Sequence, residues 1–497
     1  MPRSAARPPE GVYGAAAFAP PGSATYALPV LRPLALLAAV VAAAALAAGS
    51  AAATNQDVTI DAPDGSKLAA TLVLPDGTAP ADGWPAVIIL HGLGGDRSSS
   101  LALADSLALA GTTAVLAYDA RGHGASGGLI GIDGPNEVAD AKAVFAWLAA
   151  RPEIHDTKIA GFGTSYGGGG LLNSLVAGTP WAALVVNITW TDLETALAPQ
   201  SLAKTGVVAG FLSSLDPAKV EPELFTVRDA SFAGDIAAVR PWIAARSSTP
   251  ALKGLKTPVL ILQGRRDFAF GLEQGFAMWK QLAGPKRIWF GLHGHAPSSF
   301  PAADTSAMLQ EAALFLGVQL GTTTAKLDPA PVAIAPENWT GKPVRSAALP
   351  KVTTTTVAFP GTATIATTGR WQRATKPSAT ALEVFGAPEV KVTATASGGW
   401  SRLVAVLSAR TPAGKDIVVA GGGVPTADGK KTYTIRLSSQ ATFLPKGSKL
   451  TVTLGASSLQ QSPGDLLYLD LPMTAGARIS VGAVSLTIPR LATPVSR

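Results

Sequence analysis

The sequence contains no cysteine among its 497 residues, which excludes disulfide bonds, thiolate-bound metals and a cysteine nucleophile. Histidine is almost as scarce, with five residues. Charged residues make up only 15% of the chain and hydrophobic ones 47%, a composition typical of a folded protein with a large core. The net charge of +7 is scattered, without a dense block of Lys and Arg, so we expect no nucleic-acid partner. A chain of this length is expected to form two or more domains.

The N-terminal segment has the pattern of an export signal. Arg32 is followed by an apolar run over 34–48 and then by Ala51-Ala52-Ala53, which resembles an A-x-A cleavage site. We therefore predict a signal peptide over residues 1–53 and a secreted or cell-envelope protein. The alternative is a retained membrane anchor, and the alanine-rich run favours cleavage because alanine promotes insertion less than leucine. Contact with a membrane is expected only if this leader is retained.

Apolar runs alternate with helical patterns in the middle of the chain. Continuous apolar runs predict strands that are covered on both faces. They lie at 84–90, 113–119, 157–163, 182–189, 257–264 and 286–292. Between two of them, residues 136–150 place their apolar side chains on one helical face. This alternation predicts an α/β fold with a parallel sheet and a site at the carboxyl ends of its strands.

A glycine-rich segment follows the third of these strands and carries the candidate nucleophile. Residues 163–167, Gly-Thr-Ser-Tyr-Gly, have the G-x-S-x-G pattern of a nucleophile elbow, a sharp strand-to-helix turn that exposes a serine hydroxyl. The flanking glycines lack the Cβ atoms that would collide where the helix meets the sheet. A flexible structural loop is the alternative. The position between a strand and a helical run favours Ser165 as the nucleophile.

Serine needs a base, normally an imidazole oriented by a carboxylate, and so few histidines permit elimination. His91 starts a loop after an early strand, His123 lies in a turn, and His155 lies in a polar connector. We assign structural or solvent-exposed positions to these three. His295 follows the last predicted strand, where the base lies in the chain order Ser, Asp, His. His293, two residues earlier, is the alternative.

The orienting acid is expected after a strand between the serine and the histidine. Asp267 comes three residues after Gly264, which ends the fifth predicted strand. A surface aspartate paired with a neighbouring arginine is the alternative interpretation, and Glu273 is the weaker alternative acid. Acyl transfer also needs preorganised donors for the oxyanion. We expect them to be the backbone N–H groups of Leu93 and Tyr166.

Five motifs in this order resemble the α/β-hydrolase superfamily: HGLGG, YDARGHGASGG, GTSYGG, LQGRRD and GLHGHAP. The second and third motifs and the long C-terminal tail make the chain similar to the Xaa-Pro dipeptidyl-peptidase and cocaine esterase-like hydrolases. The resemblance implies a catalytic domain over 54–320 with a helical cap at about 190–250, followed by a jelly-roll β domain. Many members place a tyrosine in the loop where this chain has Leu93. That departure weighs against peptidase and cocaine esterase chemistry and leaves serine hydrolysis unaffected.

The tail supports a second domain. Residues 321–346 are rich in Pro and Thr, and we interpret them as a linker. Over 347–497 short strand patterns alternate with turns, which predicts an all-β sandwich or jelly roll. Two roles remain open for this domain. It is either a wall of the substrate cleft or a stabilising appendage or carbohydrate-binding module.

Together these features predict a secreted serine hydrolase that cleaves esters or amides of small molecules or peptides through an acyl-enzyme, with no metal or cofactor. The leading hypothesis is an Xaa-Pro dipeptidyl-peptidase-like activity, and a carboxylesterase without peptidase activity is the alternative. A dipeptidase needs a carboxylate for the substrate ammonium, and Asp192 and Glu194 are the candidates. For both we favour the simpler alternative of a helix cap and a first-turn charge. The rival hypothesis is a noncatalytic surface- or carbohydrate-binding protein, and the oligomeric state is not predicted.

Overall fold

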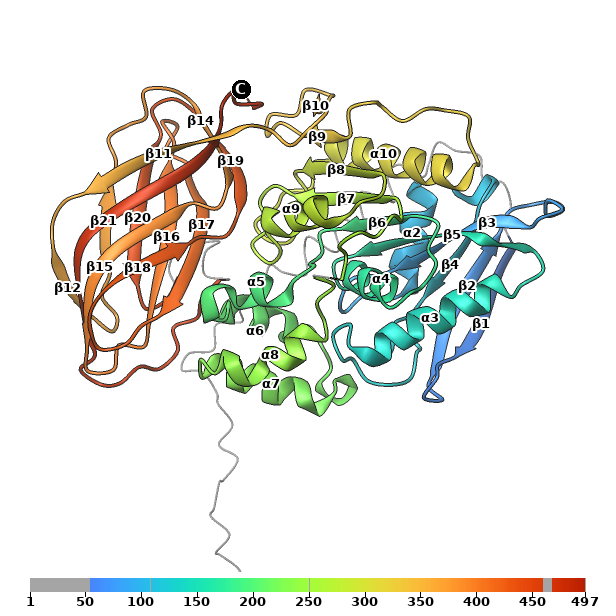
Figure 1. The fold of residues 1–497 in the computed structure, drawn as a ribbon, viewed down its shortest axis with the longest axis horizontal. Helices are drawn as coiled ribbons and strands as arrows, with labels where there is room; N and C mark the ends of the chain where they lie inside the picture. Colours follow the sequence, from blue (N-terminus) through green and yellow to red (C-terminus); the bar gives the residue numbers. More distant parts are fainter. Residues whose placement is uncertain (1–53, 108, 250, 459–466, 497) are drawn as a thin grey trace, which may run out of the picture.

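The structure is a computed structural model that describes residues 54–107, 109–249, 251–458 and 467–496. The predicted signal peptide lies outside the described residues. Two parts follow one another along the chain: helices surrounding a large sheet, and then a part built from strands alone (Figure 1). Within the described residues, no helix is long and apolar enough to cross a membrane.

A ten-stranded sheet forms the centre of the first part. Its strands lie in the order β1-β2-β4-β3-β5-β6-β7-β8-β9-β10, and those from β4 to β9 in this order run parallel. The bounds are β1 (Thr54–Asp61), β2 (Lys67–Leu74), β3 (Trp84–Leu90), β4 (Ala114–Tyr118), β5 (Ile154–Thr164), β6 (Leu184–Asn187), β7 (Val259–Gly264), β8 (Lys286–Gly291), β9 (Val332–Ile334) and β10 (Val344–Ser346). The predicted parallel sheet is confirmed, and its six predicted strands are β3 to β8.

Helices cover both faces of this sheet, because neighbouring residues of each strand point to opposite sides. Val87 and Ile89 of β3 belong to a core cluster with α2 and α10, whereas Ile88 of the same strand belongs to a cluster with α3, α4 and α9. The bounds of these helices are α2 (Arg97–Ser106), α3 (Pro135–Ala149), α4 (Tyr166–Val176), α9 (Leu272–Gln281) and α10 (Ala302–Leu320). A short 3-10 helix, η2 (Leu109–Gly111), follows α2.

A helical cap is inserted between β6 and β7, in the region predicted for it. It consists of α5 (Leu193–Leu197), η3 (Pro199–Ser201), α6 (Thr205–Ser213), η4 (Pro217–Lys219), α7 (Pro222–Phe232) and α8 (Ile236–Ala244). In Figure 1 these green helices lie beside the sheet and reach toward the strand-only part. One buried cluster joins cap residues such as Trp190 and Val239 to Val404, Val418 and Tyr468 of that part. The cap therefore packs both against the first part of the protein and against the strand-only part.

The second part consists of two antiparallel sheets that share one core. One sheet has seven strands and the other has four, in the order β13-β20-β16-β17. Val392 of the larger sheet belongs to the same buried cluster as Leu403 and Leu407 of the smaller one. The bounds are β11 (Val352–Phe359), β12 (Ala363–Ala366), β13 (Trp371–Ala374), β14 (Leu382–Gly386), β15 (Glu389–Ser397), β16 (Arg402–Arg410), β17 (Asp416–Pro425), β18 (Gly429–Arg436), β19 (Gln440–Leu444), β20 (Lys449–Gly455) and β21 (Arg478–Leu491). The predicted all-β C-terminal domain is confirmed.

The segment predicted as a linker, 321–346, also contributes to the large sheet. Within it, β9 pairs in parallel with β8, and β10 pairs antiparallel with β9.

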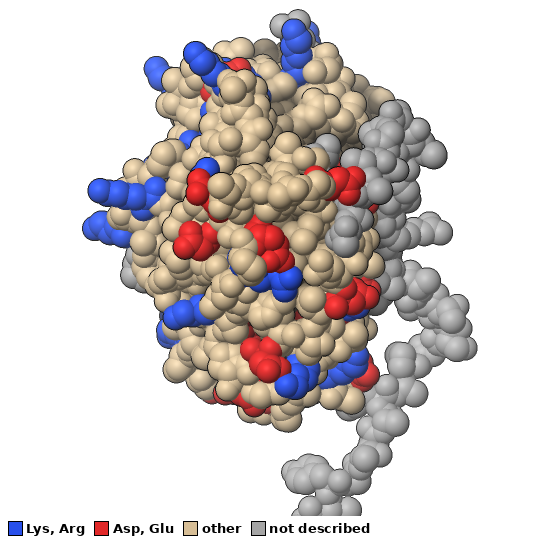
Figure 2. Space-filling view, turned by 90° about the vertical axis from the view of Figure 1, so that its right-hand side faces the viewer, with Lys and Arg blue, Asp and Glu red and all other residues tan. Residues whose placement is uncertain are grey.

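Charge on the surface of the protein is mixed in sign: on the described face drawn in Figure 2, basic and acidic side chains are interspersed.

Candidate active site

The nucleophile elbow predicted at Ser165 is present between β5 and α4. Ser165 has φ 54° and ψ −114°, a conformation that non-glycine residues rarely adopt and that the elbow imposes. The neighbouring glycines are required by close approach of the backbone. A Cβ built on Gly163 would lie 2.3 Å from the carbonyl oxygen of Gly167, and one on Gly167 would lie 2.3 Å from that of Leu90.

Three side chains from distant parts of the chain form a hydrogen-bonded series at this edge of the sheet. Ser165 Oγ lies 2.9 Å from His295 Nε2, and His295 Nδ1 lies 2.8 Å from Asp267 Oδ2. These residues follow β5, β8 and β7, and the strands between them are hydrogen-bonded neighbours whose carboxyl ends align. With Nδ1–H donated to the carboxylate, Nε2 is free to accept the serine proton.

Asp267 is fully buried, yet its surroundings favour the charged carboxylate. Its Oδ1 accepts hydrogen bonds from the backbone N–H groups of Ala269 (3.0 Å) and Phe270 (2.8 Å), and its Oδ2 also accepts that of His295 (3.0 Å). Burial alone would raise the pKa of Asp267, but the His295 ring and these N–H donors outweigh it and hold the pKa below its ordinary value. The carboxylate is therefore ionised and fixed in orientation near neutral pH.

Two phenylalanine rings hold the imidazole of His295 from the sides. Phe270 and Phe211 lie with their centroids 5.1 and 5.7 Å from the His295 ring, both in edge-to-face geometry. Such contacts restrict rotation of the ring and leave its Nε2 directed at Ser165.

The other histidines do not reach Ser165. His293, the alternative base, is 1% exposed, and burial lowers its pKa to about 4. His91 bridges two loops, because its Nε2 accepts the N–H of Ala120 (3.1 Å) and its Nδ1 lies 2.8 Å from the carbonyl oxygen of Gly92. His123 is buried with its Nδ1 3.0 Å from the Arg121 carbonyl, and His155 lies near Thr157. The structure thus places His295, rather than His293, at the serine.

The predicted oxyanion donors lie beside the nucleophile. Tyr166 is the first residue of α4, so its N–H has no partner within the helix. Leu93 and Ser165 line the same two cavities. The side chain of Tyr166 is directed elsewhere: its ring is buried, 5.3 Å from the ring of His123. The role of these two N–H groups stays a prediction.

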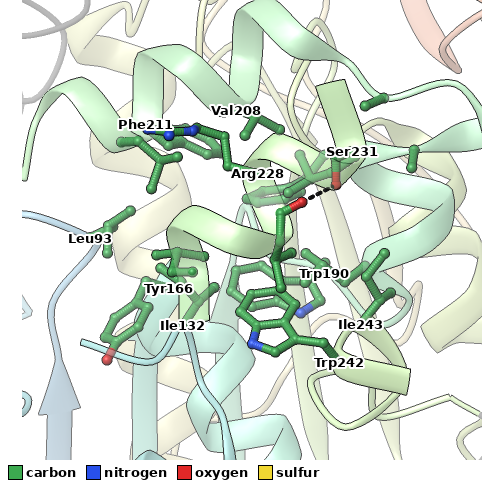
Figure 3. Close-up of a pocket in the computed structure, with 18 of the residues that line it drawn as sticks. Leu93, Ile132, Tyr166, Trp190, Val208, Phe211, Arg228, Ser231, Trp242 and Ile243 are labelled. Carbon is green, nitrogen blue, oxygen red and sulfur yellow. Dashed lines mark hydrogen bonds between the residues drawn. The ribbon is translucent and has the colours of Figure 1, made fainter. Parts of the chain in front are cut away.

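Two apolar cavities meet at Ser165. The first, of about 100 Å³, lies under the cap and is lined by side chains of α5 to α8. Figure 3 shows Trp190, Trp242 and Ile243 around it, with Leu93 and Phe211 on the opposite side. The second, of about 150 Å³, lies between α6 and the loops that follow β7 and β8. Among the described residues, neither cavity is lined by an aspartate or a glutamate.

Asp192 and Glu194, considered for a substrate-binding role, line neither of the two cavities at Ser165. Asp192 caps α5 by accepting the N–H of Thr195 at 3.0 Å. Glu194 forms a two-bonded ion pair with Arg240 at 2.8 and 2.9 Å. The helix cap and the first-turn charge, the favoured alternative, describe them correctly.

Glu273, the alternative acid, does not belong to the hydrogen-bonded series of Ser165, His295 and Asp267. It is half-buried and accepts the N–H of Ser439 at 3.2 Å, and loss of hydration raises its pKa. It belongs to the contact between α9 and the β domain. In the part of the chain that the structure describes, no group of three His, Cys, Asp or Glu residues is arranged to hold a metal ion.

Sequence reasoning predicted the cap but not the residues that line its cavity. Phe211, Trp190 and Trp242 come from three different cap segments, and a cap pattern does not specify which apolar side chains face inward. It also missed Lys204, whose ammonium is buried and donates to the carbonyl oxygens of Phe268 (2.9 Å) and Ala269 (3.2 Å). The sequence signal for this buried ammonium is a lysine that stands within an apolar segment.

Comparison with known proteins agrees with this fold. Residues 64–209 match the family model of the X-Pro dipeptidyl-peptidase (S15 family). Two curated relatives, uncharacterized proteins from Mycobacterium tuberculosis strains, are each 34% identical over 142 residues, which are 28% of this chain. This chain spans about half the length of these relatives, since the match covers 47% of each.

Solved structures resemble nearly the whole described chain. A CocE/NonD family hydrolase from Staphylococcus aureus has a TM-score of 0.69 at 14% identity, covering 88% of this chain and 94% of that one. An α-amino acid ester hydrolase has a TM-score of 0.64 at 15% identity, covering 89% and 98%. An aminopeptidase from a marine sediment archaeon, a thaumarchaeon, has a TM-score of 0.63 at 16% identity, covering 88% and 97%. The chain therefore has the α/β-hydrolase fold, and its residues 64–209 match the X-Pro dipeptidyl-peptidase (S15) family.

Proposed function

We propose that the protein is a serine hydrolase that cleaves carboxylic esters through an acyl-enzyme. The observation that carries this proposal is the continuous series Ser165–His295–Asp267, with separations of 2.9 and 2.8 Å. A serine hydroxyl is a weak nucleophile, and this geometry supplies both the base that accepts its proton and the carboxylate that orients the base.

The reaction proceeds in two halves. Ser165 Oγ attacks the ester carbonyl carbon while its proton passes to His295 Nε2. The tetrahedral intermediate collapses, the C–O bond to the alcohol breaks, and His295 returns the proton to the departing oxygen. Water then attacks the acyl-enzyme and gives a proton to His295. The bond between the acyl carbon and Ser165 Oγ breaks, His295 returns the proton to Oγ, and the carboxylic acid leaves. Asp267 holds the imidazole tautomer and stabilises the imidazolium throughout.

The oxyanion of each tetrahedral intermediate would be held by the backbone N–H groups of Leu93 and Tyr166. Donors of this kind act strongly because they are fixed before the reaction and need no reorganisation. Their backbone origin also means that side-chain substitution does not remove them.

The second candidate activity, release of N-terminal Xaa-Pro dipeptides, is favoured by the family match over residues 64–209. It requires a carboxylate that pairs with the substrate ammonium, since an unpaired charge in an apolar cavity is costly. Because the described residues that line the two cavities include no acidic side chain, the ester is the better substrate.

Labelling with a fluorophosphonate tests the hydrolase proposal directly. The wild type is expected to be labelled, and Ser165→Ala is expected to lose labelling completely. Ser306→Ala, which changes an exposed serine on α10, serves as the matched control and is expected to label like the wild type. A folded wild type that is not labelled would contradict the proposal and favour the noncatalytic binding protein.

Comparing two chromogenic substrates then separates the two activities. The purified protein is expected to hydrolyse p-nitrophenyl butyrate and to leave Ala-Pro-p-nitroanilide intact. Faster turnover of the anilide than of the ester would reverse this order and support the dipeptidyl-peptidase.

We also propose that the protein is exported, on the basis of the N-terminal pattern at residues 1–53. The measurement is the mass of the protein recovered from cell envelope and medium. Cleavage after the Ala51-Ala53 stretch is expected, and a full-length protein confined to the cytoplasm would contradict export.

A further inference from the structure

The two cavities at Ser165 lie on either side of α6 and share part of their lining. Leu93, Ser165 and Phe211 line both cavities, so these three residues mark the shared part. The cavity under the cap, which also includes Tyr166, is named the cap chamber. The cavity on the other side of α6, which also includes His295, is named the histidine chamber.

The chemistry of ester cleavage decides which half of a substrate enters which chamber. His295 must give its proton to the departing alcohol oxygen, so the alcohol has to lie on the side of the imidazole. His295 lines the histidine chamber and not the cap chamber. Tyr166, whose N–H is the expected donor to the carbonyl oxygen, lines the cap chamber and not the histidine chamber. With the alcohol oxygen facing His295 and the carbonyl oxygen facing the backbone donors, the acyl chain is the third group on the carbonyl carbon and takes the remaining opening, the cap chamber.

Both chambers accept uncharged, apolar groups of limited size. An apolar cavity of about 150 Å³ is large enough to bind benzene, and the two chambers measure about 100 and 150 Å³. Among the described residues that line the cap chamber, the charged side chain is Arg228, which already pairs with Asp229 at 2.7 Å. The histidine chamber is bounded by Val207, Ile188 and Phe300 among others.

Resting on the serine hydrolase proposed above, we propose a substrate class. The substrates are esters that join a medium-length apolar acyl group, bound in the cap chamber, to an apolar alcohol, bound in the histidine chamber. Each methylene added to the acyl group is expected to raise kcat/KM about fourfold until the cap chamber is full, because it buries further apolar surface.

Two positions on α6 offer a matched pair of variants. Val208 lines the cap chamber alone, and Gly210 lines the histidine chamber alone. A Cβ built on Gly210 meets no atom within 4 Å, so a larger side chain can be placed there without backbone strain. Val208→Phe therefore fills one chamber and Gly210→Phe the other, with the same new side chain on the same helix.

The measurement is kcat/KM over two substrate series. The acyl series consists of p-nitrophenyl acetate, butyrate and hexanoate, and the alcohol series consists of methyl, butyl and phenyl butyrate. Val208→Phe is expected to lower the ratio of hexanoate to acetate about tenfold and to leave the ratio of phenyl to methyl ester as in the wild type. Gly210→Phe is expected to do the reverse.

Two outcomes would overturn the assignment while leaving the hydrolase intact: the two variants exchange their effects, or neither ratio changes. If the wild type is neither labelled by fluorophosphonate nor active on any ester, the proposed function itself fails, and the chamber assignment fails with it.

A structure of the inactivated wild type keeps the test independent of variant folding. Hexane-1-sulfonyl fluoride has a single leaving group, fluoride. When it reacts, Ser165 Oγ forms a bond to sulfur, fluoride leaves, and the serine proton passes to His295. The hexyl chain of this adduct stands in for the acyl chain. It is expected in the cap chamber, and a hexyl chain in the histidine chamber would overturn the assignment.

Discussion

The substitution Glu383→Gln removes one charge from an ion pair that is buried where the two domains meet. Glu383 lies on β14 and Arg265 follows β7, and both are 0% exposed. The Glu383 carboxylate accepts a hydrogen bond from the Arg265 guanidinium. It also accepts hydrogen bonds from the N–H of Val495 (2.5 Å) and from the N–H and hydroxyl of Ser496 (both 3.0 Å). Glutamine keeps the volume and one acceptor oxygen, so the change isolates the charge.

The expected cost follows from the guanidinium that remains. Breaking a buried pair by removing one partner costs about 3–5 kcal/mol, because it leaves an uncompensated buried charge. Glu337 lies 4.0 Å from the same guanidinium and compensates it in part, although it is 26% exposed. We therefore expect the lower end, about 3 kcal/mol. At about 2–4 °C per kcal/mol for a domain of this size, Tm falls by about 6–12 °C.

Thermal unfolding of Glu383→Gln beside Glu389→Gln measures this effect. Glu389 is a partly exposed glutamate of β15, the next strand along the chain, so its substitution is expected to change Tm little. The double variant Arg265→Met/Glu383→Gln is expected to recover part of the loss, because it leaves no buried charge without a partner. Equal Tm values for Glu383→Gln and Glu389→Gln, or a double variant less stable than the single one, would refute the reasoning.

Three further predictions concern the site and its support. Asp267→Asn is expected to lower kcat on p-nitrophenyl butyrate about 10⁴-fold, because the imidazole of His295 loses its orienting carboxylate; circular dichroism checks that the fold is kept. Gly167→Ala is expected to lower Tm by several degrees and to abolish fluorophosphonate labelling, since the new Cβ would lie 2.3 Å from the carbonyl oxygen of Leu90. Asp133→Asn is expected to raise Tm at pH 8 and to leave it nearly unchanged at pH 4. Burial raises the pKa of Asp133 well above its ordinary value, so stability present below the unfolded pKa is lost as pH rises through the folded pKa. A Tm difference that is the same at both pH values would contradict this assignment.

The strands around the site could be predicted because each is a continuous apolar run bounded by turn residues. The run at 84–90 coincides with β3, and the other five predicted strands overlap β4 to β8. The order of Ser165, Asp267 and His295 could be predicted for a related reason. In a parallel sheet the segments after different strands meet at one edge, so chain position indicates spatial position.

The alternatives that the sequence left open concern residues whose side-chain direction is set by tertiary contacts. Asp192 and Glu194 follow β6 toward the correct edge, but α5 begins at Leu193 and directs them to a cap and to Arg240. The choice between His293 and His295 is of the same kind. Adjacent loop positions point in different directions, and only the fold decides which ring meets Ser165.

The short strands of the linker segment were missed for a different reason. The strands β9 and β10 have three residues each, too few to establish a pattern in a stretch rich in Pro and Thr. They form because β8 offers an unpaired edge of hydrogen-bonding groups that β9 can extend.

The two roles left open for the β domain can be distinguished by what its residues contact. Among the described residues of this domain, none lines either chamber, so it is no wall of the cleft in the part of the chain that is described. It instead holds the loop that carries Asp267. Gln440 Nε2 donates to the carbonyl oxygen of Asp267 at 2.8 Å, and the N–H of Ala441 donates to that of Arg265 at 2.7 Å.

The same loop is held from its other side by the cap, through the buried ammonium of Lys204 on the carbonyl oxygens of Phe268 and Ala269. Burial lowers the pKa of Lys204, so a charged lysine there costs free energy that its contacts must offset. A loop fixed by both domains has little freedom to change the distance between Asp267 and His295. The contact between the two domains therefore helps to hold Asp267 in the orientation that His295 needs. Loosening that contact is expected to slow ester hydrolysis before it unfolds the large sheet.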